Sequence, residues 1–296
     1  MLSRKAKSAI PSTVHGSDSL HVIDSNTTRS QRSNTRAVAK RSTASRAAIA
    51  SKPSFGSSPS INKSGTYGSE KIIRITSWNA QGNALLKISE NRYSILPSDR
   101  DNILLVQEAG SRNGYTVEKF GRVNYRCHFA QHETADNKRC TTGILVCENY
   151  CSNLKPINLP DVRRPLVSCK ILLKHFSLYI VTVHATAHYS VSKREIEAIV
   201  RYLKCDIKDN DQWILMGDFN LSPEQLLTSS DISKESVLCS GLPTHQSGSQ
   251  LDYAIISQGL VQSFKANNTC VCRCNTLFDS DHFSVYCEID PNMPLI

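Results

Sequence analysis

The chain has 296 residues, of which 40% are hydrophobic, 7% are aromatic and 21% are charged, and its formal net charge is +9. No apolar run reaches the roughly 18 residues of a membrane-spanning helix, and the N-terminus lacks the apolar central stretch of a secretory signal. The length and composition suffice for a domain with a full hydrophobic core.

Residues 1–70 differ in composition from the remainder of the chain. They are rich in Ser, Thr, Ala and Arg, show no sustained apolar periodicity, and hold eleven of the 35 basic but only three of the 26 acidic residues. We expect a disordered basic tail over residues 1–70 and one catalytic domain over residues 71–296. The domain is left with 24 basic and 23 acidic residues. The basic pI therefore does not show that the folded part binds nucleic acid.

Three interpretations of the tail stay open. The simplest is a flexible, solvated segment. A composition rich in Arg and Ser and poor in acids is also typical of organelle transit peptides. The pair Lys40-Arg41, with Arg36 and Arg46 nearby, is compatible with a nuclear address.

All eleven cysteines lie in residues 71–296, and an odd number cannot pair completely within one chain. Without a secretory signal, reduced thiols are expected. Cys270, Cys272 and Cys274 look like a metal cluster, but their spacing differs from the Cys-x-x-Cys pattern of zinc knuckles. Alternation in a strand would place all three on one face, so a structural role is expected.

Short apolar runs suited to buried strands dominate the folded part. They cover residues 72–78, 103–107, 142–147, 166–173, 178–184, 213–217, 252–256 and 283–289. Between them the pattern predicts few helices, at residues 84–96, from near Val191, and around residues 224–227 after Pro223. Ser190 or Ser192 is expected to cap the second helix. Many strands with few helices predict two packed sheets.

Polar side chains stand at the ends of these apolar runs. They are Asn79, Glu108, His184, Asp218, Asn220, Asp252, Asp281 and His282. Hydrolysis of an anionic phosphodiester requires a cation on the phosphoryl oxygens, a base for the attacking water, and stabilisation of the leaving oxygen. Each residue alone is more often a solvated loop acid or an ordinary surface pair. Their collection favours a phosphoester-cleaving site, in which oxygen ligands favour Mg²⁺.

The motifs around these residues carry a family resemblance. They are Ser77-Trp78-Asn79, Val106-Gln107-Glu108, Gly217-Asp218-Phe219-Asn220, Leu251-Asp252-Tyr253 and Ser280-Asp281-His282-Phe283. In this order they resemble the endonuclease/exonuclease/phosphatase superfamily. Within it, Trp78-Asn79-Ala80-Gln81-Gly82 and Gln107-Glu108-Ala109-Gly110 most resemble the B-subunit family of cytolethal distending toxins.

The resemblance implies a deoxyribonuclease-like α/β fold, a four-layer sandwich of two mixed β-sheets flanked by helices, with the site at one edge. Glu108 would hold Mg²⁺, assisted by Asn79 and Asp281, with Mn²⁺ or Ca²⁺ as substitutes. Asp218 would orient or deprotonate the attacking water, and Asn220 would bind the phosphate.

The resemblance also assigns two imidazoles and two guanidinium groups. His282, oriented by Asp252, would contact the scissile phosphate as acid or base, and His184 would serve the leaving oxygen. Arg164 and Arg139 would clamp flanking phosphates, although a plain surface charge explains Arg139 equally well. His188, His245 and Trp213 are assigned no role.

The resemblance implies a Mg²⁺-dependent DNA endonuclease, a secreted or delivered genotoxic effector that acts in a nucleus, with DNA as substrate and toxin delivery subunits as partners. The alternative is a phosphoinositide phosphatase that uses the same metal site at a membrane surface. A third reading, a scaffold that no longer catalyses, stays open, but it would require a missing catalytic group, and none of the principal ones is missing. The chain departs from the toxin pattern in its tail, its cysteines and its lack of a secretory signal.

Overall fold

The computed structural model describes residues 71–110, 113–131, 141–150, 153–208, 211–228, 230–276 and 278–296. The expected disordered tail lies outside these residues, so the domain boundary near residue 70 stays a prediction. Arg139 also lies outside the described residues. None of the described helices is both long and apolar enough to cross a membrane.

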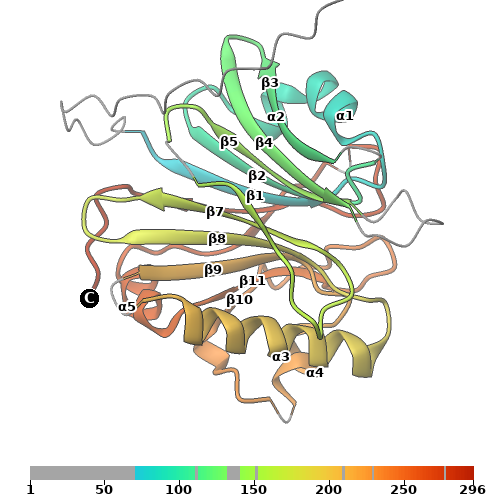
Figure 1. Cartoon of the computed structure of the whole chain (residues 1–296), viewed down its shortest axis with the longest axis vertical. Helices are drawn as coiled ribbons and strands as arrows, with labels where there is room; N and C mark the ends of the chain where they lie inside the picture. The colour runs from blue at the N-terminus through green and yellow to red at the C-terminus, as the bar shows by residue number, and fades with distance from the viewer. Residues whose placement is uncertain are drawn as a thin grey trace, which may run out of the picture. The chain divides into compact units, whose positions relative to one another are not determined.

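Two mixed β-sheets face each other (Figure 1). The strands of the first sheet are β1 Ile73–Asn79, β2 Asp101–Gln107, β3 Gly114–Phe120, β4 Val123–Gln131, β5 Thr141–Cys147, β12 Cys272–Arg273 and β13 Val285–Ile289. Those of the second are β6 Lys155–Ile157, β7 Leu166–Leu172, β8 Ser177–His184, β9 Asp211–Asp218, β10 Val237–Leu238 and β11 Asp252–Ile256. Their orders are β12-β13-β1-β2-β5-β4-β3 and β10-β11-β9-β8-β7-β6.

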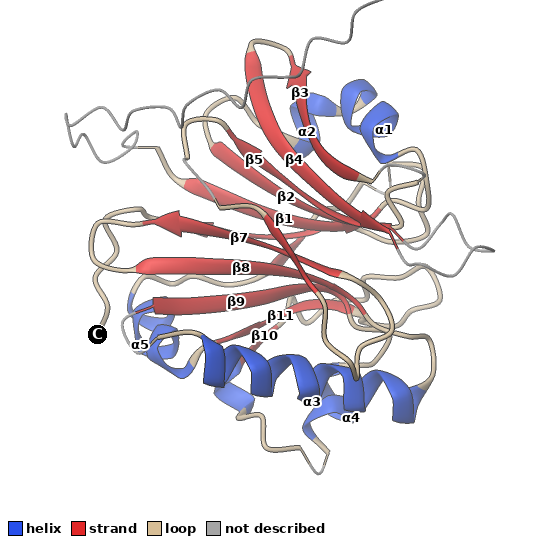
Figure 2. Cartoon of the chain, in the orientation of Figure 1, coloured by secondary structure: helices blue, strands red, loops and turns tan. Residues whose placement is uncertain are grey.

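Helices flank both sheets. They are α1 Ala84–Glu90, α2 Arg92–Ile95, α3 Tyr189–Asp206, α4 Pro223–Leu227, α5 Gln258–Ala266 and the 3-10 helix η1 Lys234–Ser236. Figure 2 shows α1 and α2 outside the seven-stranded sheet and α3 and α4 outside the six-stranded sheet, whereas the buried apolar residues of α5 pack into the core between the sheets. The predicted α/β sandwich of two mixed sheets flanked by helices is thus confirmed.

The central strands are buried on both faces. In β1, Ile75 points into the core between the sheets, whereas Trp78 packs on the helix side. In β9, Met216 lies between the sheets and Leu215 lies under the helices. Because both faces are covered, these strands appear in the sequence as nearly uninterrupted apolar runs.

Five strands were not among the predicted apolar runs, namely β3, β4, β6, β10 and β12. In β3 the side chains alternate between exposed and half-buried, and Tyr115 and Val117 are 59% and 50% exposed. Such an edge strand has no apolar run to reveal it. The predicted helix over residues 84–96 is two helices that meet at Asn91, and α5 was not predicted.

The predicted cap of α3 is wrong. The helix begins at Tyr189 with His188 as N-cap, and no side chain caps it by a hydrogen bond. Ser192 lies inside the helix, where its buried hydroxyl donates to the carbonyl oxygen of Phe219 at 2.7 Å. The hydroxyl therefore links α3 to the segment that follows β9.

Two residues fix the sheets close to the edge where the polar residues gather. Buried Gln107 donates from Nε2 to Ser77 Oγ at 3.1 Å within its own sheet and to Thr182 Oγ1 at 2.9 Å in the other. Gly217 lets β9 approach β8 closely, because a Cβ there would lie 2.0 Å from the carbonyl oxygen of Val183. Both sheets therefore meet the site in a fixed register.

Candidate active site

Four strand ends converge at one edge of the sandwich. Asn79 ends β1, Glu108 follows β2, and His184 and Asp218 end β8 and β9. The β1–β2 and β8–β9 pairs are parallel, so both members of each pair end at the same edge. The structure thus brings residues from both sheets together.

Asp218 is the centre of this group. The residue is 1% exposed, and its Oδ2 accepts hydrogen bonds from Asn79 Nδ2 at 3.0 Å and from Asn220 Nδ2 at 3.3 Å. Its Oδ1 accepts the backbone N–H of Asn220 at 2.9 Å. A buried carboxylate needs such donors to remain charged. They hold Asp218 in one orientation.

Asn220 supports Asp218 from within the same turn. Its Nδ2 also donates to the carbonyl oxygen of Ala185 at 2.9 Å, so the amide group is engaged within the protein. The predicted bond from Asn220 to phosphate would require the amide to release one of these two acceptors. In the present geometry Asn220 holds the Asp218 carboxylate in place by hydrogen bonds.

The backbone turns left-handed at three strand exits. The φ angles of Gln81, Glu108 and Asn220 are 50°, 50° and 49°. A non-glycine residue there costs on the order of 1 kcal/mol, and such strain gathers at functional sites. At Glu108 the carbonyl oxygen accepts the N–H of Gly82 at 2.6 Å, which ties the β1 and β2 exits together.

His282 and Asp252 form a buried pair. His282 Nδ1 lies 2.9 Å from Asp252 Oδ2, and the backbone N–H of Asp252 donates to Thr244 Oγ1. Burial raises the pKa of Asp252 to about 6. Burial alone would lower the pKa of His282, but the carboxylate of Asp252, helped by Asp218 and Asp281, raises it to about 9. The pair is therefore ionised near neutral pH, and Nε2 of His282 faces the site.

His184 approaches Asp218 from the opposite side. Its Nε2 lies 3.6 Å from Glu108 Oε1 and 3.7 Å from Asp218 Oδ2. Burial, which outweighs the attraction of Asp218, lowers the pKa of His184 to about 3. The ring is therefore neutral near pH 7. Two carboxylates beside Nε2 favour the tautomer with the proton on that atom.

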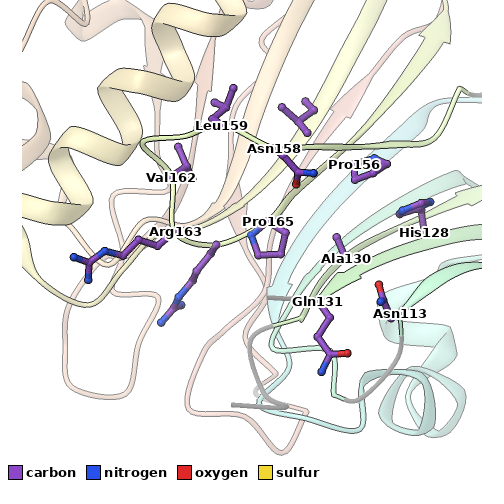
Figure 3. Close-up of a pocket in the computed structure, with 12 residues that line it drawn as sticks. Asn113, His128, Ala130, Gln131, Pro156, Asn158, Leu159, Val162, Arg163 and Pro165 are labelled. Carbon is purple, nitrogen blue, oxygen red and sulfur yellow. The ribbon is translucent and has the colours of Figure 1, made fainter. Parts of the chain in front are cut away.

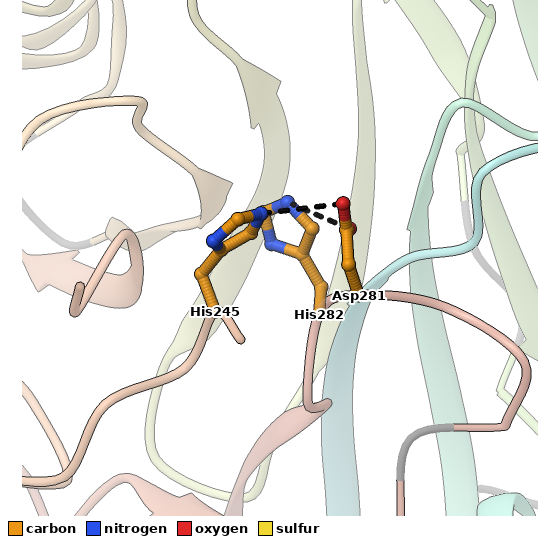
Figure 4. A group of neighbouring side chains, drawn as sticks. All are labelled: His245, Asp281 and His282. Carbon is orange, nitrogen blue, oxygen red and sulfur yellow. Dashed lines mark ion pairs between the residues drawn. The ribbon is translucent and has the colours of Figure 1, made fainter. Parts of the chain in front are cut away.

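Asp281 faces two neighbouring imidazoles, as Figure 4 shows. Its Oδ1 is 3.6 Å from His282 Nε2, and its Oδ2 is 3.3 Å from His245 Nε2. The two rings pack edge to face with centroids 4.7 Å apart. The backbone N–H of Asp281 donates to Gln81 Oε1 at 3.2 Å. His245 is thus a member of the site that the sequence analysis left without a role.

Hydrogen bonds define the tautomer of His245. Its Nδ1 accepts the backbone N–H of Ser247 at 3.0 Å, so in the neutral ring the proton resides on Nε2. That N–H faces Asp281 and suits His245 as a partner of the carboxylate rather than as a metal ligand. The only sequence signal is that His245 lies a few residues before Leu251-Asp252-Tyr253, one of the motifs that carry the family resemblance.

Arg164 lies at the margin of the group. Its positive charge contributes to the low pKa of His184, and its Nη1 is buried without a hydrogen bond to any described residue. Arg164 also lines a polar pocket of about 450 Å³ together with Arg163 and Gln131 (Figure 3). A guanidinium with an open donor is suited to an anion.

The available donors fit a hard divalent cation. Oδ1 of Asp281 is buried, yet within the described part of the chain it makes no hydrogen bond. The Glu108 side chain is 27% exposed, and among the described residues Asn79 Oδ1 accepts only the N–H of Gln81, at 3.2 Å. Carboxylate and amide oxygens are the ligands that Mg²⁺ takes. Asp218, Asp252 and His282 also bring one potential ligand atom each within 4.8 Å of one another, but these atoms are already paired.

Comparison with solved structures identifies the fold. The chain matches the structure of CdtB, the biologically active subunit of cytolethal distending toxin, with a TM-score of 0.54 and 20% identity over 72% of this chain and 96% of that one. Truncated Caenorhabditis elegans TDP2 matches with a TM-score of 0.50 and 15% identity, over 74% and 98% of the two chains. The human nocturnin catalytic domain with bound sulfate matches with a TM-score of 0.50 and 17% identity, over 74% and 93%.

No protein-family model matches the chain, and a search of curated proteins finds no match either. The structural matches show an endonuclease/exonuclease/phosphatase-like fold, as predicted from the motifs. At these identities they establish the fold alone.

Proposed function

We propose that this chain, which has the endonuclease/exonuclease/phosphatase-like fold, is a Mg²⁺-dependent DNA endonuclease similar to the toxin subunit. The observation that carries the proposal is the convergence of two imidazoles on Asp218: Nε2 of His184 and Nε2 of His282 lie 3.7 Å and 3.9 Å from Asp218 Oδ2. Three groups that can handle a proton or an anion thus surround one point.

Glu108, Asn79 and Asp281 would hold the cation. When bound, Mg²⁺ would neutralise charge on the phosphoryl oxygens as a Lewis acid. The remaining chemistry belongs to the side chains. Asp218, held by the amides of Asn79 and Asn220, presents a fixed acceptor that orients the attacking water.

The two histidines have different protonation states and therefore different tasks. His282, with a pKa of about 9, is an imidazolium near neutral pH, and its Nε2–H can donate to a phosphoryl oxygen as charge develops there. His184, with a pKa of about 3, is neutral, so it would serve the leaving oxygen by an N–H hydrogen bond rather than by delivering a proton. Arg164 would bind a flanking phosphate.

DNA is proposed as the substrate because the toxin-type motifs flank the site residues, and the tail could add salt-sensitive contacts with phosphates. Delivery by toxin partner subunits and action in a nucleus follow from the same resemblance and belong to the proposal. A phosphoinositide phosphatase would use the same groups, and the experiment below distinguishes the two.

Plasmid nicking by the full-length protein, with Mg²⁺ and with a chelator, tests the proposal, and release of phosphate from a soluble inositol polyphosphate is measured in parallel. We expect Mg²⁺-dependent nicking that is lost in His184→Ala and Asp281→Ala proteins. Phosphate release without nicking would show that the phosphatase, and not the nuclease, is the correct assignment. Nicking that persists in both variants would show that the site is assigned wrongly.

A further inference from the structure

Glu195 is a buried carboxylate on α3 that the proposed mechanism does not use. The residue is 1% exposed, and no described Lys, Arg or His forms an ion pair with it. Backbone and hydroxyl donors satisfy it instead. Its Oε1 accepts the N–H of Arg163 at 3.0 Å and the hydroxyl of Thr186 at 2.9 Å, and its Oε2 accepts the N–H of Thr186 at 2.8 Å. A buried carboxylate held this way fixes the groups that donate to it.

One of these partners continues directly into the site. Thr186 stands two residues after His184, where β8 leaves the sheet. The intervening Ala185 donates its N–H to the carbonyl oxygen of Asp218 and accepts from the Asn220 amide, both at 2.9 Å. Fixing Thr186 therefore fixes the exit on which His184, Asp218 and Asn220 depend.

The other partner precedes Arg164. On one side of Arg164, the N–H of Arg163 donates to Glu195. On the other side, the carbonyl oxygen of Pro165 accepts the Thr142 hydroxyl at 2.6 Å. The segment that carries Arg164 is thus anchored at one end to α3 and at the other to β5 of the opposite sheet. Between these anchors Arg164 keeps a buried Nη1 with no hydrogen bond to the described residues.

Ser192 extends the same helix face by one turn. Residues three apart on a helix are neighbours, and the Ser192 hydroxyl donates to the carbonyl of Phe219, between Asp218 and Asn220. A single face of α3 therefore reaches the exits of β8 and β9 and the segment of Arg164.

We infer that Glu195 is a positioning residue that sets Arg164 and His184 relative to each other. The inference rests on the proposed function, because it assigns Arg164 to substrate phosphate and His184 to the leaving oxygen. A carboxylate is required because two backbone N–H groups and a hydroxyl converge on two acceptor oxygens. In Glu195→Gln, an amide N–H₂ would replace one of the two acceptor oxygens. A donor would then face a donor, and at least one of the three hydrogen bonds would be lost.

The test combines kinetics with a readout that does not depend on activity. In Glu195→Gln we expect kcat to fall and KM to rise, with kcat/KM reduced about 10-fold to 100-fold, because displacements near 1 Å suffice for losses of this size. The side-chain NMR resonances of His184 and Arg164 should both shift. Ser257→Ala, which removes a buried hydrogen bond to Gln212 at the other end of β11, is the control; it should lower the urea midpoint but leave kcat and KM unchanged.

The outcomes separate this inference from the proposed function. The role of Glu195 would be overturned by unchanged resonances of His184 and Arg164. It would also be overturned if the loss of activity were fully explained by a smaller folded fraction of the variant. Shifted resonances with unchanged kinetics would overturn it as well. If the wild-type protein does not nick DNA, the proposed function fails, and the resonances still decide whether Glu195 sets the two side chains. Should Glu195→Gln not fold, Thr186→Val removes one of the three hydrogen bonds and permits the same comparison.

Discussion

Asn79 Nδ2 donates to Asp218 Oδ2 at 3.0 Å, and this hydrogen bond joins the last residue of β1 in one sheet to the last residue of β9 in the other. Both side chains are buried. The bond spans the interface between the sheets at the point where the proposed chemistry occurs. It makes the alignment of the sheets a part of the site.

Asn79→Ala should therefore weaken both stability and activity. Loss of a donor to a buried carboxylate costs about 1–3 kcal/mol, measurable by urea unfolding. We expect the nicking rate to fall by about 100-fold, since Asp218 loses its orientation and the cation loses a proposed ligand. Ser257→Ala should lose stability only. An Asn79→Ala protein with the wild-type nicking rate would contradict the role given to this bond.

The buried pair of His282 and Asp252 predicts a pH dependence of stability. The pKa of His282 is about 9 in the folded protein, above its unfolded value of about 6.5. Its stabilising contribution is therefore fully present below about pH 6.5 and is lost as the pH rises through about 9.

In Asp252→Asn this contribution should disappear, because the carboxylate that holds the proton is gone. The difference in unfolding free energy between wild type and variant should narrow between about pH 7 and about pH 9.5. Urea unfolding across that range measures this difference. The cysteines are the same in both proteins, so the effect of their titration cancels when one unfolding free energy is subtracted from the other. A difference that stays constant over the range would count against the pairing.

His245→Ala should raise the Mg²⁺ concentration needed for half-maximal nicking by about 10-fold, a size typical of residues that orient a metal ligand. The reason is the contact of His245 Nε2 with Asp281 Oδ2 at 3.3 Å. His245→Gln keeps an N–H near the same place and should recover part of the loss. The rise in melting temperature on adding Mg²⁺ gives a second measurement. The same Mg²⁺ dependence in the wild type, His245→Ala and His245→Gln would show that His245 does not contribute to cation binding.

Gly217→Ala tests the close approach of β8 and β9. The added Cβ would meet the backbone oxygen of Val183 at 2.0 Å, and neither strand can yield without breaking its ladder. We expect a loss of about 3 kcal/mol in unfolding free energy, together with loss of nicking. A urea midpoint equal to that of the wild type would show that the strands separate more easily than the geometry indicates.

Much of the architecture could be predicted because the central strands are buried on both faces. β1, β2, β8 and β9 each form a run that the sequence displays directly, and the polar residues that end these runs are the ones that meet in space. β3 could not be found in this way, because half of its side chains are exposed and its place depends on pairing with β4.

The site was predictable to the extent that its residues sit at strand ends. His245 was not, because its relation to Asp281 depends on a loop that returns to the site, where the two chain segments form a bridge between His245 and His282. Glu195 was hidden among the residues of an amphipathic helix. Nothing local distinguishes a buried helix carboxylate with distant partners from an exposed one.

The last strand has a consequence for how the protein is made. β13 lies between β12 and β1, with Ile289 paired to Ile73, and the segment that carries Asp281 and His282 leads into it. A nascent or truncated chain that stops before β13 leaves β1 paired with β2 alone and leaves the segment of Asp281 and His282 without the strand that anchors it. Such a chain should lack the proposed activity, because the site residues cannot assemble before β13 has been synthesised.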